Sequence, residues 1–158
     1  MNVSPTPQTR PDDRKDRILD VAQSFIQTVG YNGFSYRDVA EIIGIKSASI
    51  HHHFPKKEDL GVAVTLRYSD RFASQLSAIK IDNNNLRTIL KSYLSLFKLA
   101  LSQEGHMCLC GMLGSETTSL PIKVRDQTQK FFDLNVEWLC QQFEKPNRNE
   151  EALTPKQA

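Results

Sequence analysis

The chain has 158 residues, of which 39% are hydrophobic and 24% are charged, and its formal net charge is +2. This composition excludes a disordered or collagen-like chain and fits one folded domain, or a small head joined to a larger body. No stretch approaches the roughly 20 consecutive apolar residues that span a bilayer, so we expect no membrane partner.

Residues 1–12 contain three prolines and no apolar run. A secretory signal requires an apolar core, so this segment is expected to be a flexible arm. The cysteines are three in number, Cys108, Cys110 and Cys140. They form no even-numbered disulfide framework, which favours a cytoplasmic location.

The charge balance does not by itself indicate nucleic-acid binding. Residues 1–60 carry eight lysines and arginines against eight aspartates and glutamates. Any interaction with DNA must therefore depend on where the charges lie and not on their sum.

Helical periodicity dominates the chain, beginning with a predicted helix from Asp13 to Val29. Its apolar residues fall on one stripe, namely Ile18, Val21, Ala22, Phe25 and Val29. Gly30 and Gly33 then permit a turn. A second helix is expected to begin after Ser35, because Ser35 and Asp38 have the spacing of a capping box. Gly44 ends it.

The third predicted helix is very short, from about Ser47 to His53, and Pro55 ends it. Ile50 and Phe54 have the i, i+4 spacing that would anchor it to the two helices before it. The other side chains are small or polar and are expected to face outward. Two short helices joined by a glycine turn and supported by a longer first helix describe a helix-turn-helix.

Two lysines, Lys56 and Lys57, begin the fourth predicted helix, which extends to about Ser77. Positive side chains oppose the macrodipole at a helix start, but beside a phosphate they and the free N–H groups would form an anion site. The alternative is that Glu58 and Asp59 neutralise them on a solvated surface.

Three further helical elements are expected after a polar break at Asp82–Asn85. The first begins at Leu86, is apolar on more than one side, and is predicted to be the central core helix. A short element covers about Met107 to Glu116, and a long helix opened by Leu120-Pro121 extends to about Phe143. The chain is polar from Pro146 to Ala158.

From Arg14 to Leu60 the sequence resembles the DNA-binding head of the TetR/AcrR family. The resemblance rests on the pattern G-x-x-x-x-S-x-x-x-[VI]-A-x-x-x-G-[VI] that starts at Gly30, followed by H-F-x-x-K-E-x-L from His53. It implies an all-α fold with a three-helix helix-turn-helix over residues 13–58 and a helical effector and dimerisation domain over residues 59–145. A polar tail, residues 146–158, would stand where the family has two further helices.

The resemblance also implies roles for residues of the head. Ser35, Tyr36 and Arg37 would contact phosphates and one base, Lys57 would bind a phosphate together with Lys56, and the reading surface would comprise Lys46, Ser47, Ala48, Ser49, His51 and His52. Two positions depart from the family pattern, since Lys46 replaces a small hydroxyl residue and His51 replaces a tyrosine.

The body offers candidates for effector binding or sensing. A ligand pocket could be lined by Tyr93, Phe97, Leu101, Phe131 and Trp138, although aromatic residues at helical spacing also form plain cores. Cys108 and Cys110 are interpreted as small buried hydrophobic residues of one helix. The sharper hypothesis makes one of them, above all Cys108, a thiol that senses oxidants or electrophiles.

Neither metal nor cofactor is expected. Consecutive histidines on a helix point about 100° apart, so His51, His52 and His53 cannot share one ion. His106, Cys108 and Cys110 lack a fourth ligand for zinc. The chain also carries none of the common catalytic motifs and is not predicted to be an enzyme.

The predicted function is that of a cytoplasmic homodimeric repressor on a palindromic DNA operator, released by a small ligand or a thiol-reactive signal. One alternative is a thiol- or metal-dependent enzyme that uses His106, Cys108 and Cys110. The other is a helical interaction protein with a vestigial helix-turn-helix.

Overall fold

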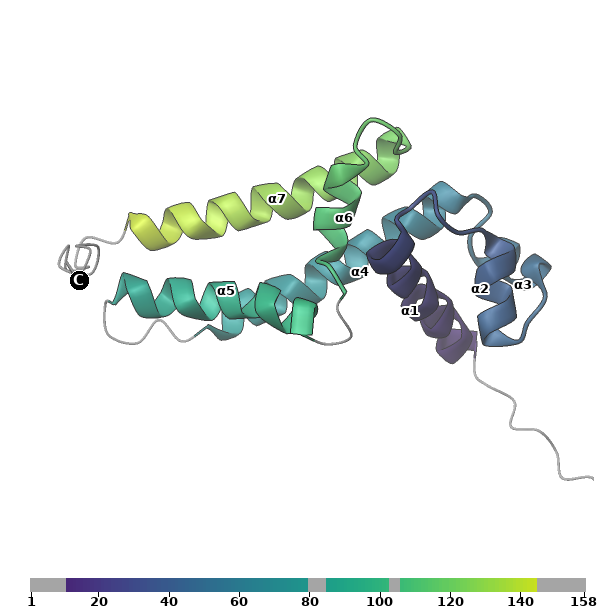
Figure 1. The fold of residues 1–158 in the computed structure, drawn as a ribbon, viewed down its shortest axis with the longest axis horizontal. Helices are drawn as coiled ribbons and strands as arrows, with labels where there is room; N and C mark the ends of the chain where they lie inside the picture. Colours follow the sequence, from purple (N-terminus) through teal and green to yellow (C-terminus); the bar gives the residue numbers. More distant parts are fainter. Residues whose placement is uncertain (1–10, 80–84, 103–105, 145–158) are drawn as a thin grey trace, which may run out of the picture.

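The computed structural model describes residues 11–79, 85–102 and 106–144, and these form helices connected by turns, with no strand among them. The predicted all-α class is confirmed. The helices are α1 (Pro11–Val29), α2 (Tyr36–Ile43), α3 (Ser47–His53), α4 (Lys57–Ala78), α5 (Leu86–Ser102), α6 (Leu109–Ser115) and α7 (Ile122–Phe143) (Figure 1). Most of the predicted arm, most of the polar break and all of the predicted tail lie outside the described residues.

Two predicted boundaries were wrong. α1 begins at Pro11 and not at Asp13, since proline is tolerated in the first turn of a helix. α6 begins at Leu109, with Cys108 as its N-cap residue and not inside the helix. The seven-residue α3 has the predicted bounds.

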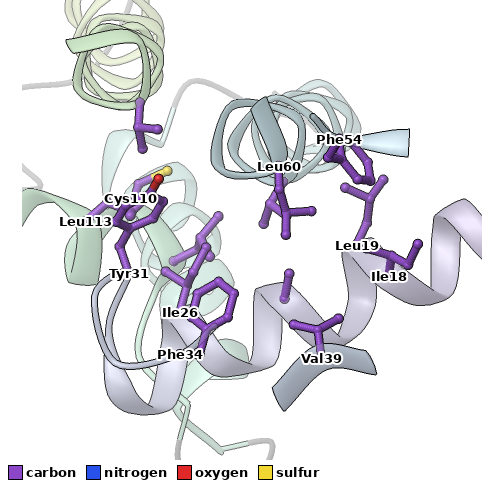
Figure 2. Packing of buried hydrophobic residues seen from close by; sticks show 14 of the residues in the cluster. Ile18, Leu19, Ile26, Tyr31, Phe34, Val39, Phe54, Leu60, Cys110 and Leu113 are labelled. Carbon is purple, nitrogen blue, oxygen red and sulfur yellow. The ribbon is translucent and has the colours of Figure 1, made fainter. Parts of the chain in front are cut away.

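The head consists of α1, α2 and α3 packed against the first turns of α4. Ile18, Ala22 and Ile26 of α1 are fully buried, and Val39 and Leu60 meet them from α2 and α4 (Figure 2). The predicted stripe on α1 is correct at its start and wrong at its end, because Val29 is 52% exposed. Val29 has the angular position of the stripe, but it is the last residue of α1, where the helix ends and Gly30 follows.

The long helix α4 belongs to both parts of the molecule. Leu60 and Val64 are buried in the head, while Phe72 and Leu76, further along the helix, are buried in the body. Figure 1 shows α4 passing from beside α2 and α3 into the body, where α5 and α7 flank it. The division of the chain at residue 58 stays a prediction.

The prediction that the fifth helix forms the centre of the core was wrong. Leu94 and Leu101 of α5 are each 55% exposed, whereas Val124 and Phe131 of α7 are buried against α4. A helix with apolar residues on several sides does not reveal which side will be covered. None of the described helices is long and apolar enough to cross a membrane.

Candidate nucleic-acid interface

The start of α2 is fixed by the predicted capping box. The carboxylate of Asp38 accepts a hydrogen bond from the backbone N–H of Ser35 and another from its hydroxyl, both at 2.7 Å. The backbone N–H of Asp38 points back to the Ser35 hydroxyl oxygen at 3.5 Å. These bonds from Ser35 hold the pKa of Asp38 below its ordinary value. Gly44, at φ 76°, ends the helix in the left-handed conformation.

Both predicted anchors of α3 are buried, Ile50 completely and Phe54 almost so. A further contact, which the sequence did not reveal, comes from α2: the Tyr36 hydroxyl donates a hydrogen bond of 2.9 Å to the carbonyl of Phe54. A helix of seven residues has little stability of its own. The position of α3 is therefore set by these three side chains.

The other residues between Lys46 and His52 form a surface that we call the recognition face. Lys46, Ala48, His51 and His52 are exposed on it, and Ser47 and Ser49 are half-buried. It consists of the residues Lys46, Ser47, Ala48, Ser49, His51 and His52. The structure thus places together all six residues predicted to form the reading surface.

Two other predicted contacts, Ser35 and Arg37, are exposed at the start of α2. Tyr36, between them, is in a different position from the one expected. Its side chain is buried, its ring lies 4.6 Å from that of His51, and its hydroxyl is bonded inside the head. Burial raises the pKa of the Tyr36 phenol. This placement favours support of α3 over the predicted contact with a phosphate.

Lys57 also departs from its predicted placement. Its ammonium group donates a hydrogen bond to the carbonyl of Phe34 and lies 4.2 Å and 4.8 Å from the ring centres of Phe34 and Tyr31. Burial lowers the pKa of Lys57, and the nearby carboxylates of Glu116 and Asp38 oppose this effect. In this arrangement Lys57 holds the turn before α2 against α4.

The start of α4 favours the second of the two interpretations offered for its lysines. The backbone N–H of Lys56 already donates to the carboxylate of Asp59 at 3.0 Å, so it is not free for an anion. The carboxylate of Glu58 lies 3.9 Å from the Lys56 ammonium and 3.3 Å from that of Lys123. Lys56 remains exposed and able to approach a phosphate, whereas Lys57 is directed inward.

In the body, four of the five predicted effector residues belong to one aromatic cluster. The rings of Tyr93 and Trp138 are stacked at 5.5 Å, and Phe97 is 5.2 Å from Tyr93. Phe131 joins through Phe72 of α4, at 5.0 Å. Leu101, 55% exposed, is the predicted residue that does not fit.

The sequence analysis missed three members of this cluster. Tyr68 and Phe72 contribute their rings from α4, and the i, i+4 spacing of these two aromatics was the available signal. Asn135 of α7 accepts a hydrogen bond of 3.0 Å from the Tyr93 hydroxyl. No local pattern marked Asn135.

The three cysteines differ in their surroundings. Cys110 is fully buried, and this burial raises the pKa of its thiol. Cys108 is half-buried, with its sulfur 3.4 Å from the Tyr68 hydroxyl, and Cys140 is exposed on α7. Among the described residues, no group of three or more histidines, cysteines, aspartates or glutamates is placed to hold a metal ion.

Comparison with known proteins agrees with this architecture. Residues 18–64 match the family described as bacterial regulatory proteins, tetR family. A TetR transcriptional regulator from Legionella pneumophila, known from its crystal structure, is 42% identical. Its TM-score is 0.76, and the match covers 96% of this chain and 78% of that one. This chain belongs to the TetR family.

Two further relatives show how far the likeness extends. A TetR-family regulator from Agrobacterium tumefaciens is 31% identical with a TM-score of 0.80, over 85% of this chain and 72% of that one. The transcriptional repressor ComR of Escherichia coli strain K12 is 29% identical over 108 residues, 68% of this chain and 51% of ComR. The chain spans about half, or less, of the length of ComR and of the other curated relatives compared with it.

Proposed function

We propose that this TetR-family chain binds duplex DNA through the recognition face and regulates transcription, by default as a repressor. One observation carries the proposal: α3 is anchored by Ile50 and Phe54, while Ala48, His51 and His52 are exposed and the two serines are half-buried. An exposed helix of small and polar residues adds little to a core. It suits the major groove, which is about 12 Å wide and presents hydrogen-bonding groups on the base edges.

The chemistry of the recognition face fits this role. Hydroxyl groups such as those of Ser47 and Ser49 can donate to or accept from base edges, and Lys46 can pair with guanine or with a phosphate. Ser35 and Arg37, exposed at the start of α2, are in a position to contact the backbone beside the groove. Residues 45–57 contain no aspartate or glutamate, so no carboxylate on this segment would repel the phosphates.

The proposal includes a homodimer on a palindromic operator, because two heads about 34–36 Å apart would reach successive major grooves. An apolar strip on α7 supports pairing of two copies. Phe132, Val136 and Phe143 share one side of the helix and are 39%, 60% and 57% exposed. The aromatic cluster is the proposed site of effector action. A regulator of this kind works where the DNA is, which implies the cytoplasm, and we propose no catalytic activity.

The test begins with selection of binding sequences from a random duplex library, followed by affinity measurements on the recovered site. Lys46→Ala should weaken binding by tenfold or more and make the affinity less dependent on salt. Lys130→Ala is the matched control, since it removes an exposed lysine from α7 and should leave the affinity unchanged. If no duplex binds at low salt, or if both variants bind equally to the wild type, the proposal is wrong.

A further inference from the structure

The recognition face of this chain carries two histidines. The sequence contains four histidines, and three of them are consecutive on α3. His51 and His52 are exposed on the recognition face, while His53 is half-buried beside Phe54. Histidine is the side chain whose charge ordinarily changes between about pH 5 and 8.

The contacts of His51 leave one ring nitrogen able to take up a proton. Its Nδ1 lies 3.3 Å from the carbonyl oxygen of Pro55. A carbonyl oxygen only accepts hydrogen bonds, so in this pair Nδ1 carries the hydrogen and Nε2 is the nitrogen that can be protonated. The ring of His52 lies 5.5 Å from that of His53.

The helices around the recognition face contribute several cations. From α1, Arg14 and Lys15 act on His53, where burial and the neighbouring positive charges lower its pKa. Lys46 is the N-cap residue of α3, Arg37 is exposed on α2, and Lys56 is exposed just after α3. The side chains around α3 thus add positive charge beside the recognition face.

The carboxylates of the neighbouring elements are mostly occupied elsewhere. Asp38 of α2 is bonded to Ser35, and Glu41 of the same helix is exposed. On α4, Glu58 and Asp59 face Lys123 at 3.3 Å and 3.9 Å. Tyr36, the remaining titratable group beside His51, has its hydroxyl bonded to Phe54.

Duplex DNA would reverse this local field, because it carries one negative charge per roughly 1.7 Å of its axis. A group that gains a proton more readily in the complex than in the free protein makes the complex more stable at lower pH. We propose that DNA binding by this chain is proton-linked, with His51 and His52 taking up protons against the phosphates, so that affinity rises as pH falls from 8 to 6.

This inference rests on the proposed DNA binding and adds its regulation by pH. Each proton taken up changes the affinity by at most about tenfold per pH unit. The affinity of the full chain for its selected duplex should therefore fall roughly 10- to 100-fold between pH 6 and pH 8 at constant ionic strength. Each additional charge also steepens the dependence of log affinity on log salt by about 0.9, so the slope should be steeper at pH 6.

Substitutions distinguish the contributions of the individual histidines to the pH dependence of DNA affinity. The double variant His51→Gln, His52→Gln should bind at all pH values as the wild type does at pH 8, with one salt slope throughout. The His52→Lys variant carries a positive charge at position 52 at every pH used. At pH 8 it should therefore retain part of the affinity that the wild type shows at pH 6. The controls His53→Gln and His106→Gln should retain the wild-type profile. Circular dichroism at each pH verifies that the helices are intact.

The outcomes distinguish the two proposals. Absence of binding at every pH would overturn the DNA-binding function itself. Binding whose pH profile is unchanged in the double variant, or is abolished by His53→Gln alone, would overturn the proton linkage only. If the double variant fails to fold, the imidazole resonances of the wild type can be titrated with and without the duplex. Their midpoints should move to higher pH on binding, and unchanged midpoints would contradict the inference.

Discussion

The carboxylate of Glu116 accepts a hydrogen bond of 2.6 Å from the backbone N–H of Tyr31, joining residues 85 positions apart in the chain. Tyr31 belongs to the turn after α1, and Glu116 is the C-cap residue of α6. Two other bonds join the same two parts of the chain, from Gln27 to the carbonyl of Met107 at 2.7 Å and from Asn32 to the hydroxyl of Ser119 at 3.0 Å. Together they attach both ends of α6 to the head, where Figure 2 shows Tyr31 beside Cys110 and Leu113.

Glu116→Gln keeps the size of the side chain and removes its charge. Hydrogen bonds to charged groups contribute about 1.5–3 kcal/mol and neutral ones about 1 kcal/mol, so the free energy of unfolding should fall by about 1 kcal/mol. Urea denaturation measures this loss. Glu137→Gln, at an exposed position on α7, is the control and should change little. Equal stability of the two variants would contradict the importance of this bond.

Gly30 and Gly44 provide a matched pair of substitutions. Both have positive φ, 82° and 76°, so alanine at either should cost about 1–2 kcal/mol in backbone strain. A Cβ on Gly30 would also lie 2.5 Å from Oε1 of Glu116, whereas Gly44 has open space. Gly30→Ala should therefore lower the thermal midpoint more than Gly44→Ala. In a Glu116→Ala background, the thermal midpoints of the Gly30→Ala and Gly44→Ala variants should lie closer together. If the gap between the two midpoints stays constant, Glu116 is not its cause.

Tyr36→Phe should loosen α3 without removing either of its buried anchors. The variant leaves the carbonyl of Phe54 without its hydroxyl partner, a loss of about 1–3 kcal/mol. Amide hydrogen exchange should become faster in α3. Tyr93→Phe removes a similar hydroxyl, bonded to Asn135 in the body, and should leave exchange in α3 unchanged. If the two variants affect α3 alike, the loosening is not local.

Asp38 should make the stability depend on pH in the acid range. Its pKa is lowered in the folded state by the bonds from Ser35. Its contribution is therefore present above its unfolded pKa of about 3.9 and is lost as pH falls through the folded value. The difference in thermal midpoint between the wild type and Asp38→Asn should accordingly shrink between pH 6 and pH 3. Ser35→Ala should show the same trend, and a pH-independent difference would refute the linkage.

The cysteines should react with iodoacetamide in the order of their exposure, Cys140 first and Cys110 last. The thiolate is the reactive form, and burial both shields Cys110 and raises the pKa of its thiol. Mass spectrometry of the native protein after timed labelling gives the three rates, with urea-unfolded protein as the reference. Rapid native labelling of Cys110 would contradict the structure. Rapid labelling of Cys108, if it also released DNA, would support the sensing hypothesis, which stays a prediction.

The sequence predicted best where the signal is local. The bounds of α3 followed from the anchors Ile50 and Phe54 and from Pro55, and the capping box of α2 needed only Ser35 and Asp38. Such features depend on residues within one or two helical turns, so their spacing is sufficient to predict them.

The orientations of Tyr36 and Lys57 were harder to predict, because an amphipathic side chain can be buried in the core of the head or exposed on its surface. Their orientation depends on Phe54 and Phe34, which approach only when the helices pack. The cluster in the body posed the same difficulty. An apolar helix such as α5 offers several faces, and nothing in its own sequence shows that Phe97 meets α4 while Leu101 remains exposed.

The division of α3 into a buried and an exposed side has a practical consequence for protein engineering. Its attachment depends on Ile50, Phe54 and the Tyr36 hydroxyl, none of which belongs to the recognition face. A combinatorial library that randomises only the exposed residues Lys46, Ala48, His51 and His52 should therefore yield mostly folded proteins, since exposed positions tolerate substitution. The scaffold can then be retargeted to new DNA sequences without redesign of its interior.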